Sequence, residues 1–256
     1  MFTFTEAQLA EWLSPIIWPF LRVLALFSVA PVFSLKSIPQ RAKIGLAFFV
    51  ALAAQASLAD QPQISINSPQ AFGAVVQQVG VGMSIGFAVR LVFAAVELAG
   101  ELVGLQMGLN FASFFDPGSN TQISAVARFM GHMSILLFVV MNGHLIVLMA
   151  VVKSFDSFPV DGNFLEVLAQ VKLYTLGTQL FASALWMALP MVAMLLFVNL
   201  TMGVISRVAP QMNIYAIGFP VTLTMGLVGV TVTLPMMDQP VMALMERAID
   251  LFAAQR

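Results

Sequence analysis

Gly203-Val-Ile-Ser-Arg-Val-Ala-Pro-Gln-Met-Asn-Ile-Tyr-Ala-Ile-Gly-Phe-Pro220 separates two long runs without a charged residue, 173–206 and 208–237. A transmembrane helix needs about 20 consecutive apolar residues, and each run exceeds that length. A polar, proline-containing interruption of this kind is tolerated only at a membrane surface or inside protein. The sequence therefore predicts two apolar helices joined by a break. The residues that we assign to this break, and to a contact with another subunit, are Arg207, Pro210, Gln211 and Asn213.

The composition of the whole chain agrees with a membrane protein. Of its 256 residues, 60% are hydrophobic and only 9% are charged, whereas soluble domains carry roughly 25% charged residues. The formal net charge of −1 gives no basic field for nucleic acid. The chain has no cysteine, which excludes disulfides and thiolate metal sites. The N-terminus is acidic, so we expect no cleaved signal peptide.

Apolar residues gather in about six segments, and we expect these to be helices, several of them broken, of an all-α, multi-helix integral membrane protein with a single domain over 1–256. The second segment is short for a membrane span and the third is about twice the usual length. Charges in the connectors are too evenly distributed to set an orientation by the positive-inside rule. Such irregular segments suit helices that face other subunits as much as lipid. The segments are 13–33, 44–59, 72–112, 129–152, 175–200 and 214–237.

The third segment contains glycines at intervals of four and three ionisable residues on one helical face. Small residues at this spacing let helix backbones approach closely, either within one chain or between subunits. Charged residues inside membrane helices usually face a partner or water. The charged face therefore either meets basic groups of another subunit or lies in water outside the bilayer. The glycines are Gly82, Gly86, Gly100, Gly104 and Gly108, and the charged residues are Arg90, Glu97 and Glu101.

A bulky aromatic cluster precedes a strong turn signal after this segment. In a conducting assembly, such apolar groups on a loop can close a pore by steric block or dewetting. Alternatively, they anchor the loop at the membrane interface. The candidate plug residues are Phe111, Phe114, Phe115, Asp116, Pro117 and Gly118.

Enzymatic alternatives have weak support in the sequence. Gly82-Met-Ser-Ile-Gly86 matches the G-x-S-x-G string of serine hydrolases, but that motif works only at a strand–turn–helix elbow. His132 and His144 fall about 120° apart around a helix, too few and too misaligned for a metal site. We therefore expect no catalytic, cofactor or metal site. A solute transporter is a second alternative, although the internal repeat typical of that class is not visible.

Three stretches carry a resemblance to a known family. They are Arg22–Phe33 with the following Ile38–Ala47, Gly104–Asn120 and Gly203–Pro220. Together with chain length and hydropathy, they make the chain similar over essentially its whole length to the FliR family, integral components of the flagellar type III export gate.

This resemblance implies a helical hetero-oligomer with FliP and FliQ homologues, contacted by an FlhB homologue, in the bacterial inner (cytoplasmic) membrane of the flagellar basal body. Residues up to about 175 would be built like FliP, and about 176–256 like a FliQ helical hairpin. The pore would pass unfolded rod, hook and filament subunits, with the loop at about 104–120 as its plug. Besides these proteins, membrane lipid is the expected partner. Injectisome homologues share the architecture, so an export gate of a virulence injectisome is an alternative, ahead of a small-solute transporter.

Overall fold

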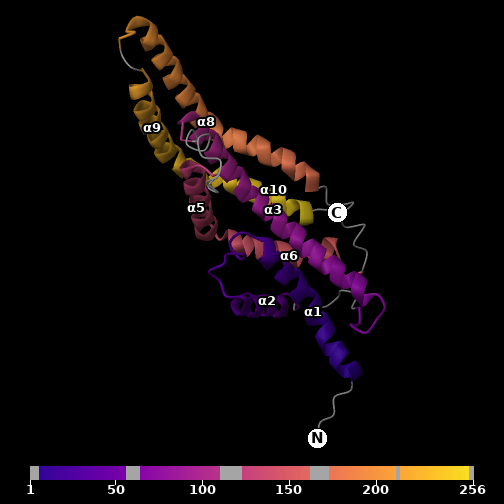
Figure 1. The fold of residues 1–256 in the computed structure, drawn as a ribbon. Coiled ribbons are helices and arrows are strands. Elements are labelled where there is room, and N and C mark those ends of the chain that lie inside the picture. The colour runs from indigo at the N-terminus through magenta and orange to yellow at the C-terminus, as the bar shows by residue number, and fades with distance from the viewer. Residues whose placement is uncertain (1–5, 56–63, 110–122, 162–172, 212–213, 254–256) are drawn as a thin grey trace. The chain divides into compact units, whose positions relative to one another are not determined.

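A computed structural model describes residues 6–55, 64–109, 123–161, 173–211 and 214–253. Within these ranges the chain forms helices and contains no strand (Figure 1). The α-helices are α1 (Glu6–Val29), α2 (Gln40–Gln55), α3 (Ala71–Gln106), α5 (Ala125–Val140), α6 (Gly143–Ser157), α8 (Leu173–Val208), α9 (Ile214–Thr233) and α10 (Asp238–Ala253). A short 3-10 turn, η1 (Leu234–Met236), joins the last two.

Four described helices contain windows that are long and apolar enough to cross a membrane: Trp12–Val29, Ala71–Gln106, Tyr174–Val208 and Ala216–Met236. The prediction of an all-α, multi-helix membrane protein is therefore confirmed. α3 and α8 have 36 residues each, which corresponds to about 54 Å at 1.5 Å per residue. That length exceeds the hydrocarbon thickness of about 30 Å.

The fourth predicted segment, 129–152, is two helices rather than one. α5 and α6 meet at a bend of 69°, and the pair would count as a fifth span if it crosses as one unit. Asn142 at the bend has φ 56° and ψ 27°. Asparagine enters this left-handed region more readily than most residues, and Gly143 follows it at the start of α6. The local Asn-Gly pair thus ends one helix and redirects the next.

The chain forms two compact units that alternate along the sequence. The first comprises residues 1–91, 141–176 and 245–256, and the second comprises 92–140 and 177–244. α3 contributes its first part to one unit and its second part to the other. The proposed division at about residue 175 into FliP-like and FliQ-like parts stays a prediction.

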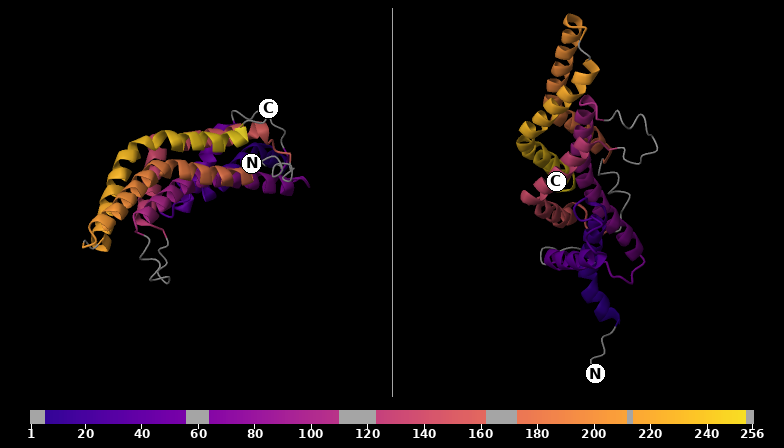
Figure 2. Two further views of the ribbon diagram at one scale, coloured as in Figure 1. Left: turned by 90° about the horizontal axis from the view of Figure 1, so that it is seen from above. Right: turned by 60° about the vertical axis from the view of Figure 1, so that its left-hand side comes forward.

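The first unit has a core of aromatic and small apolar side chains from α1, α2, α3 and α6. Phe27 and Phe155 are fully buried in it. The indole of Trp18 donates a hydrogen bond from Nε1 to the carbonyl oxygen of Ile64 at 3.0 Å. α2 lies beside α1, as Figure 1 and the right-hand view of Figure 2 show.

The second unit contains α5, the second part of α3 and most of α8 and α9. α8 and α9 run as an antiparallel pair (Figures 1 and 2). Phe93 and Phe138 pack edge to face, with ring centroids 5.4 Å apart. Glycine allows close contact between α8 and α9, because a Cβ at Gly229 would lie 2.6 Å from Cε of Met194.

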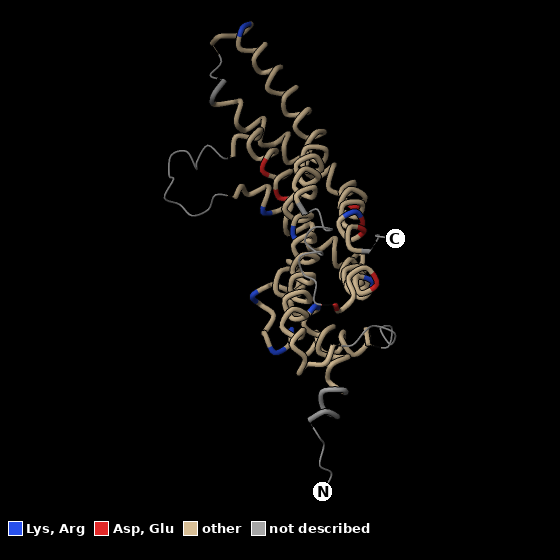
Figure 3. The backbone as a smooth tube through the Cα atoms, turned by 90° about the vertical axis from the view of Figure 1, so that its right-hand side faces the viewer, with Lys and Arg blue, Asp and Glu red and all other residues tan. Residues whose placement is uncertain are grey.

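α8 and α9 expose most of their apolar surface. Only 28% of the apolar window of α8 and 22% of that of α9 is buried. Trp186, Phe197 and Val208 are 74%, 70% and 80% exposed. Charged residues are sparse along the chain (Figure 3). Surfaces of this composition need lipid or another protein to cover them.

α10 was not among the six segments expected from the sequence. Its buried residues recur at helical spacing, with Val241, Met245, Ala248 and Phe252 on one face. Glu246 is exposed between them. This pattern is that of an amphipathic helix with one apolar stripe.

Candidate functional site

Arg22 is a fully buried arginine in the middle of α1, within the candidate span Trp12–Val29. Its Nε donates a hydrogen bond to Oε1 of Gln78 on α3 at 2.8 Å. Nη1 donates to Oγ of Ser154 on α6 at 2.8 Å, and Nη2 donates to the carbonyl oxygen of Phe158 at 2.7 Å. The guanidinium carbon lies 3.5 Å from the ring centroid of Phe155.

These contacts make the burial of a charge possible. An isolated buried guanidinium is very unfavourable, whereas one with several hydrogen bonds and a ring face beneath it is stabilised. Because its partners belong to α3 and to α6 and its C-terminal end, Arg22 holds three segments of the first unit together. Ionisable residues at such positions in membrane proteins mark functional or assembly sites.

A chain of amide hydrogen bonds leads from Arg22 to an acidic residue. Nε2 of Gln78 donates to Oε1 of Gln77 at 3.3 Å. Nε2 of Gln77 in turn donates to the carboxylate of Asp161. Gln77 and Gln78 are buried and Asp161 is exposed, so the chain connects the interior of the unit to its surface.

Sequence reasoning did not single out this network, although Arg22 begins one of the stretches that carry the family resemblance. Two local signals point to it. An arginine stands inside an otherwise apolar span, and two adjacent glutamines stand near the start of the apolar α3. Buried polar groups need partners, so such residues are expected to find one another.

Gly82 and Gly86 lie where α3 crosses α1. A Cβ at Gly82 would come within 2.2 Å of the carbonyl oxygen of Arg22, and one at Gly86 within 3.0 Å of Cβ of Val29. This close approach places Gln78, one turn before Gly82, within hydrogen-bonding distance of Arg22. Both glycines are therefore used in packing within the chain, one of the two alternatives that their spacing left open.

Gly100 and Glu97 lie where α3 meets α5 in the second unit. A Cβ at Gly100 would lie 2.5 Å from Cα of Ala127. One at Gly131 would lie 3.0 Å from Cγ and Oε1 of Glu97. Exposed Glu97 thus packs its side chain on a glycine of α5.

Glu101 secures the beginning of α5. Its Oε1 accepts a hydrogen bond of 2.6 Å from the backbone N–H of Ser124. Oγ of Ser124 in turn accepts one from the N–H of Ala127 at 3.1 Å, as a capping serine does. Glu101 therefore has a partner within the chain, and a contact of Glu97 and Glu101 with basic groups of another subunit stays a prediction. Arg90 is exposed on α3.

The last residues of α3 and those that follow are held against α9. Met107 is fully buried, and a Cβ at Gly226 would lie 2.4 Å from its Cγ. Oγ1 of Thr222 donates to the carbonyl oxygen of Met107 at 3.4 Å. Gly104 is buried in α3, and Gly108 follows the helix with a positive φ of 79°. Glycine adopts a positive φ without the steric penalty of a Cβ atom, and a glycine in this conformation commonly ends a helix, as it does after α3.

The candidate plug residues Phe111, Phe114, Phe115, Asp116, Pro117 and Gly118 lie outside the described residues. Their role as a plug stays a prediction.

The predicted break between the last two apolar runs is present and is shorter than expected. α8 continues to Val208, eight residues beyond the predicted end, and includes Arg207 in its last turn. Pro210 and Gln211 form the turn that follows, and both are exposed, as is Arg207. Asn213 lies outside the described residues.

The serine of the G-x-S-x-G string, Ser84, lies inside α3 and not at a strand–turn–helix elbow. His132 is exposed, and its Nδ1 lies 2.6 Å from the carbonyl oxygen of Arg128 in its own helix. Within the described ranges, no group of three or more histidine, aspartate and glutamate side chains could hold a metal ion. The geometry thus offers contacts between helices rather than a hydrolase motif.

Comparison with known proteins gives a consistent result. The family described as "Bacterial export proteins, family 1" matches residues 13–248. The flagellar biosynthetic protein FliR of Escherichia coli (strain K12) is 42% identical over 227 residues, covering 89% of this chain and 87% of that protein. FliR of Pectobacterium carotovorum subsp. carotovorum is 38% identical over 258 residues, covering 99% and 97%. FliR of Bacillus subtilis (strain 168) is 28% identical over 212 residues, covering 82% of each chain.

The apolar helices, the match over residues 13–248 and the two relatives above 30% identity agree over nearly the whole chain. The chain therefore belongs to the FliR family of flagellar biosynthetic proteins, within family 1 of the bacterial export proteins, and is a membrane-embedded component of the flagellar export apparatus.

Proposed function

We propose that this protein is a non-enzymatic core subunit of the flagellar type III export gate. It crosses the bacterial inner membrane several times and forms part of the pore through which unfolded rod, hook and filament proteins leave the cytoplasm. FliP, FliQ and FlhB homologues are its partners in a hetero-oligomer. One observation carries the proposal: the apolar surface of α8 is longer than a bilayer can cover.

The argument depends on length and exposure. α8 is about 54 Å long, and only 28% of its apolar window is buried. Exposed apolar side chains extend from Tyr174 near its start to Val208 at its end. The hydrocarbon core covers about 30 Å, so the remaining apolar surface would lie in water. Exposing that surface to water is unfavourable, and contact with other protein subunits would cover it, as expected for a subunit of a helical assembly.

The plug role of residues 104–120 is supported by how the chain is held on either side of the aromatic cluster. Met107 packs on Gly226 of α9, and Ser124 is bound by Glu101 of α3. All four residues belong to the second unit. Fixed borders of this kind suit a segment that closes and reopens a pore without releasing its helices.

Deletion of the gene, followed by complementation, tests the proposal. The medium is assayed for hook and filament subunits, and tagged protein is purified from membranes to identify co-purifying subunits. Loss of secretion with rescue by the gene, together with FliP and FliQ homologues in the purified complex, is the expected result. Normal flagellar secretion in the deletion strain would refute the flagellar role and direct attention to an injectisome.

A further inference from the structure

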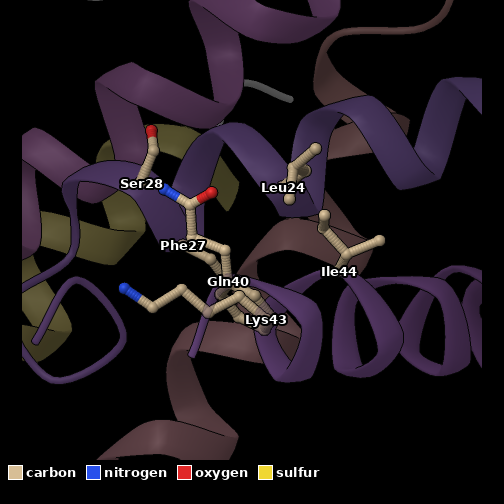
Figure 4. Close-up of a pocket in the computed structure, with 6 residues that line it drawn as sticks. All are labelled: Leu24, Phe27, Ser28, Gln40, Lys43 and Ile44. Atoms are coloured by element: carbon tan, nitrogen blue, oxygen red, sulfur yellow. The ribbon is translucent and has the colours of Figure 1, made fainter. Parts of the chain in front are cut away.

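A cavity of about 390 Å³ lies between α1 and α2, both in the first unit (Figure 4). Leu24, Phe27 and Ser28 of α1 and Gln40, Lys43 and Ile44 of α2 line it. In Figure 4 the polar ends of Ser28, Gln40 and Lys43 lie toward one side, and Leu24 and Ile44 lie toward the other. The cavity is thus divided into a polar part and an apolar part. Its volume falls within the range of about 300–1,000 Å³ that is usual for ligand pockets.

The polar part has donors and an acceptor to offer a ligand. Nζ of Lys43 donates one hydrogen bond, to the carbonyl oxygen of Leu35 at 3.2 Å, and an ammonium group has three N–H donors. The hydroxyl of Ser28 donates to the carbonyl oxygen of Ala25 at 2.6 Å, which leaves its oxygen as an acceptor. The amide of Gln40 supplies both kinds of group. A ligand with an anionic centre and hydroxyl groups fits this set.

The charge around the cavity has one sign. Lys36, Arg41 and Lys43 stand within eight residues, just before α2 and in its first turn, and residues 12–59 contain neither aspartate nor glutamate. Arg22, the other cation in this stretch, is fully buried in its own hydrogen bonds. The stretch that supplies the lining of the cavity therefore carries basic residues and no acidic residue. An anion is favoured there by charge complementarity.

An apolar track continues from the cavity along α2. Ile44, Phe48 and Leu52 are four residues apart, so they follow one another on one helical face, and all three are exposed. A free phosphate ion would use only the polar part of the cavity. A phospholipid would use both parts, with its phosphate at Lys43 and an acyl chain along this track. Basic pockets between membrane helices bind lipid headgroups in this way.

We propose that the cavity between α1 and α2 is a binding site for an anionic phospholipid. Lys43 and Gln40 hold the headgroup phosphate, and Leu24, Phe27 and Ile44 contact the beginning of an acyl chain. The site requires only that the protein is embedded in a membrane, so it is independent of the proposed role in the pore.

Native mass spectrometry of the purified full chain, alone or with any export subunits that co-purify, tests the site. The purified protein is first reconstituted in nanodiscs of equal parts phosphatidylglycerol and phosphatidylcholine. We expect retained phosphatidylglycerol in preference to phosphatidylcholine. Lys43→Gln should weaken this retention about fivefold, which corresponds to about 1 kcal/mol for one basic residue near a lipid surface. Lys153→Gln, a change at an exposed lysine of α6 outside the cavity, is the matched control and should retain lipid normally.

A second variant tests the space in the cavity separately from the charge of Lys43. Ser28→Phe keeps Lys43 but fills the space between the helices, so it should also lose the retained lipid, while circular dichroism confirms an unchanged helix content. Equal retention by Lys43→Gln and the unaltered protein would overturn the proposal, as would equal retention of the two lipids. Displacement of the lipid by excess inorganic phosphate would instead identify a free-anion site. Lipid retention is measured without any export assay. A negative lipid result would therefore refute this site without affecting the secretion test of the proposed function.

Discussion

Replacing Arg22 with methionine removes the buried guanidinium while keeping an unbranched, apolar stem on α1. Oγ of Ser154 retains a hydrogen bond to the carbonyl oxygen of Val151 at 2.6 Å. Oε1 of Gln78 and the carbonyl oxygen of Phe158 lose the donors that Arg22 supplies. A buried polar group left without its partner costs about 2 kcal/mol. Because two acceptors lose their donor, we expect a loss of about 4 kcal/mol in the free energy of unfolding.

A double-mutant cycle makes this reasoning refutable. Gln78→Leu removes one of the two orphaned acceptors, so adding it to Arg22→Met should cost less than the sum of the single changes. We expect a coupling free energy of about 2 kcal/mol, because removing both partners of a buried hydrogen bond is far less harmful than removing one. The assay is denaturant unfolding of the purified protein in detergent, followed by circular dichroism.

Arg207→Met is the control for the loss of a charge, because Arg207 is exposed at the end of α8. It should leave the unfolding midpoint unchanged. Additive effects of Arg22→Met and Gln78→Leu, or equal effects of the two arginine changes, would show that the hydrogen bond between Arg22 and Gln78 does not stabilise the first unit.

Two further predictions follow from the contacts and a third from the proposed plug. Gly82→Ala should lower the free energy of unfolding by about 2 kcal/mol, because the new Cβ meets the α1 backbone. Gly45→Ala is the control in the same denaturation experiment. A Cβ at Gly45 would have no neighbouring atom within 4 Å, so this change should not lower the free energy of unfolding. Glu101→Gln should speed amide hydrogen exchange at Ser124 about fivefold, since a neutral acceptor replaces a charged one, and unchanged exchange would contradict the anchoring role. Deletion of Phe111–Asn120 should make cell membranes leaky to ions, measured as conductance in reconstituted complexes, and an unaltered conductance would argue against a plug.

Hydropathy was sufficient to predict the helical class and the long apolar helices, because membrane helices are encoded by uninterrupted apolar length. Hydropathy did not predict the bend between α5 and α6 or the presence of α10, because these depend on a local backbone conformation and on helical periodicity. The bend at Asn142 depends on one backbone conformation within an apolar run. α10 buries Val241, Met245 and Phe252 but has too many charges to count as an apolar segment. Its helical period, rather than its mean hydropathy, was the usable signal.

The sequence predicted only part of the candidate site, namely the close contacts at the glycines. Glycine spacing indicated close helix contacts but could not name the partner, which the structure gives for Gly82 as the backbone of α1 at Arg22. The buried arginine was harder to anticipate, because Gln78 and Ser154 are 56 and 132 residues away from it in the sequence. Local signals mark the polar residues inside apolar helices, but which of them pair over such separations is a property of the tertiary fold.

That same separation bears on how the protein is made. The ribosome adds about 5–20 residues per second, so Ser154 emerges roughly 7–26 s after Arg22, given their separation of 132 residues. Throughout this interval the arginine of α1 lacks part of its hydrogen-bond set. An arginine within a membrane helix costs about 2.5–3.5 kcal/mol to insert. The first helix to be synthesised is thus among the last to have its hydrogen bonds completed. Truncated chains that end before α6 are accordingly expected to be poor at membrane insertion and good substrates for quality-control proteases.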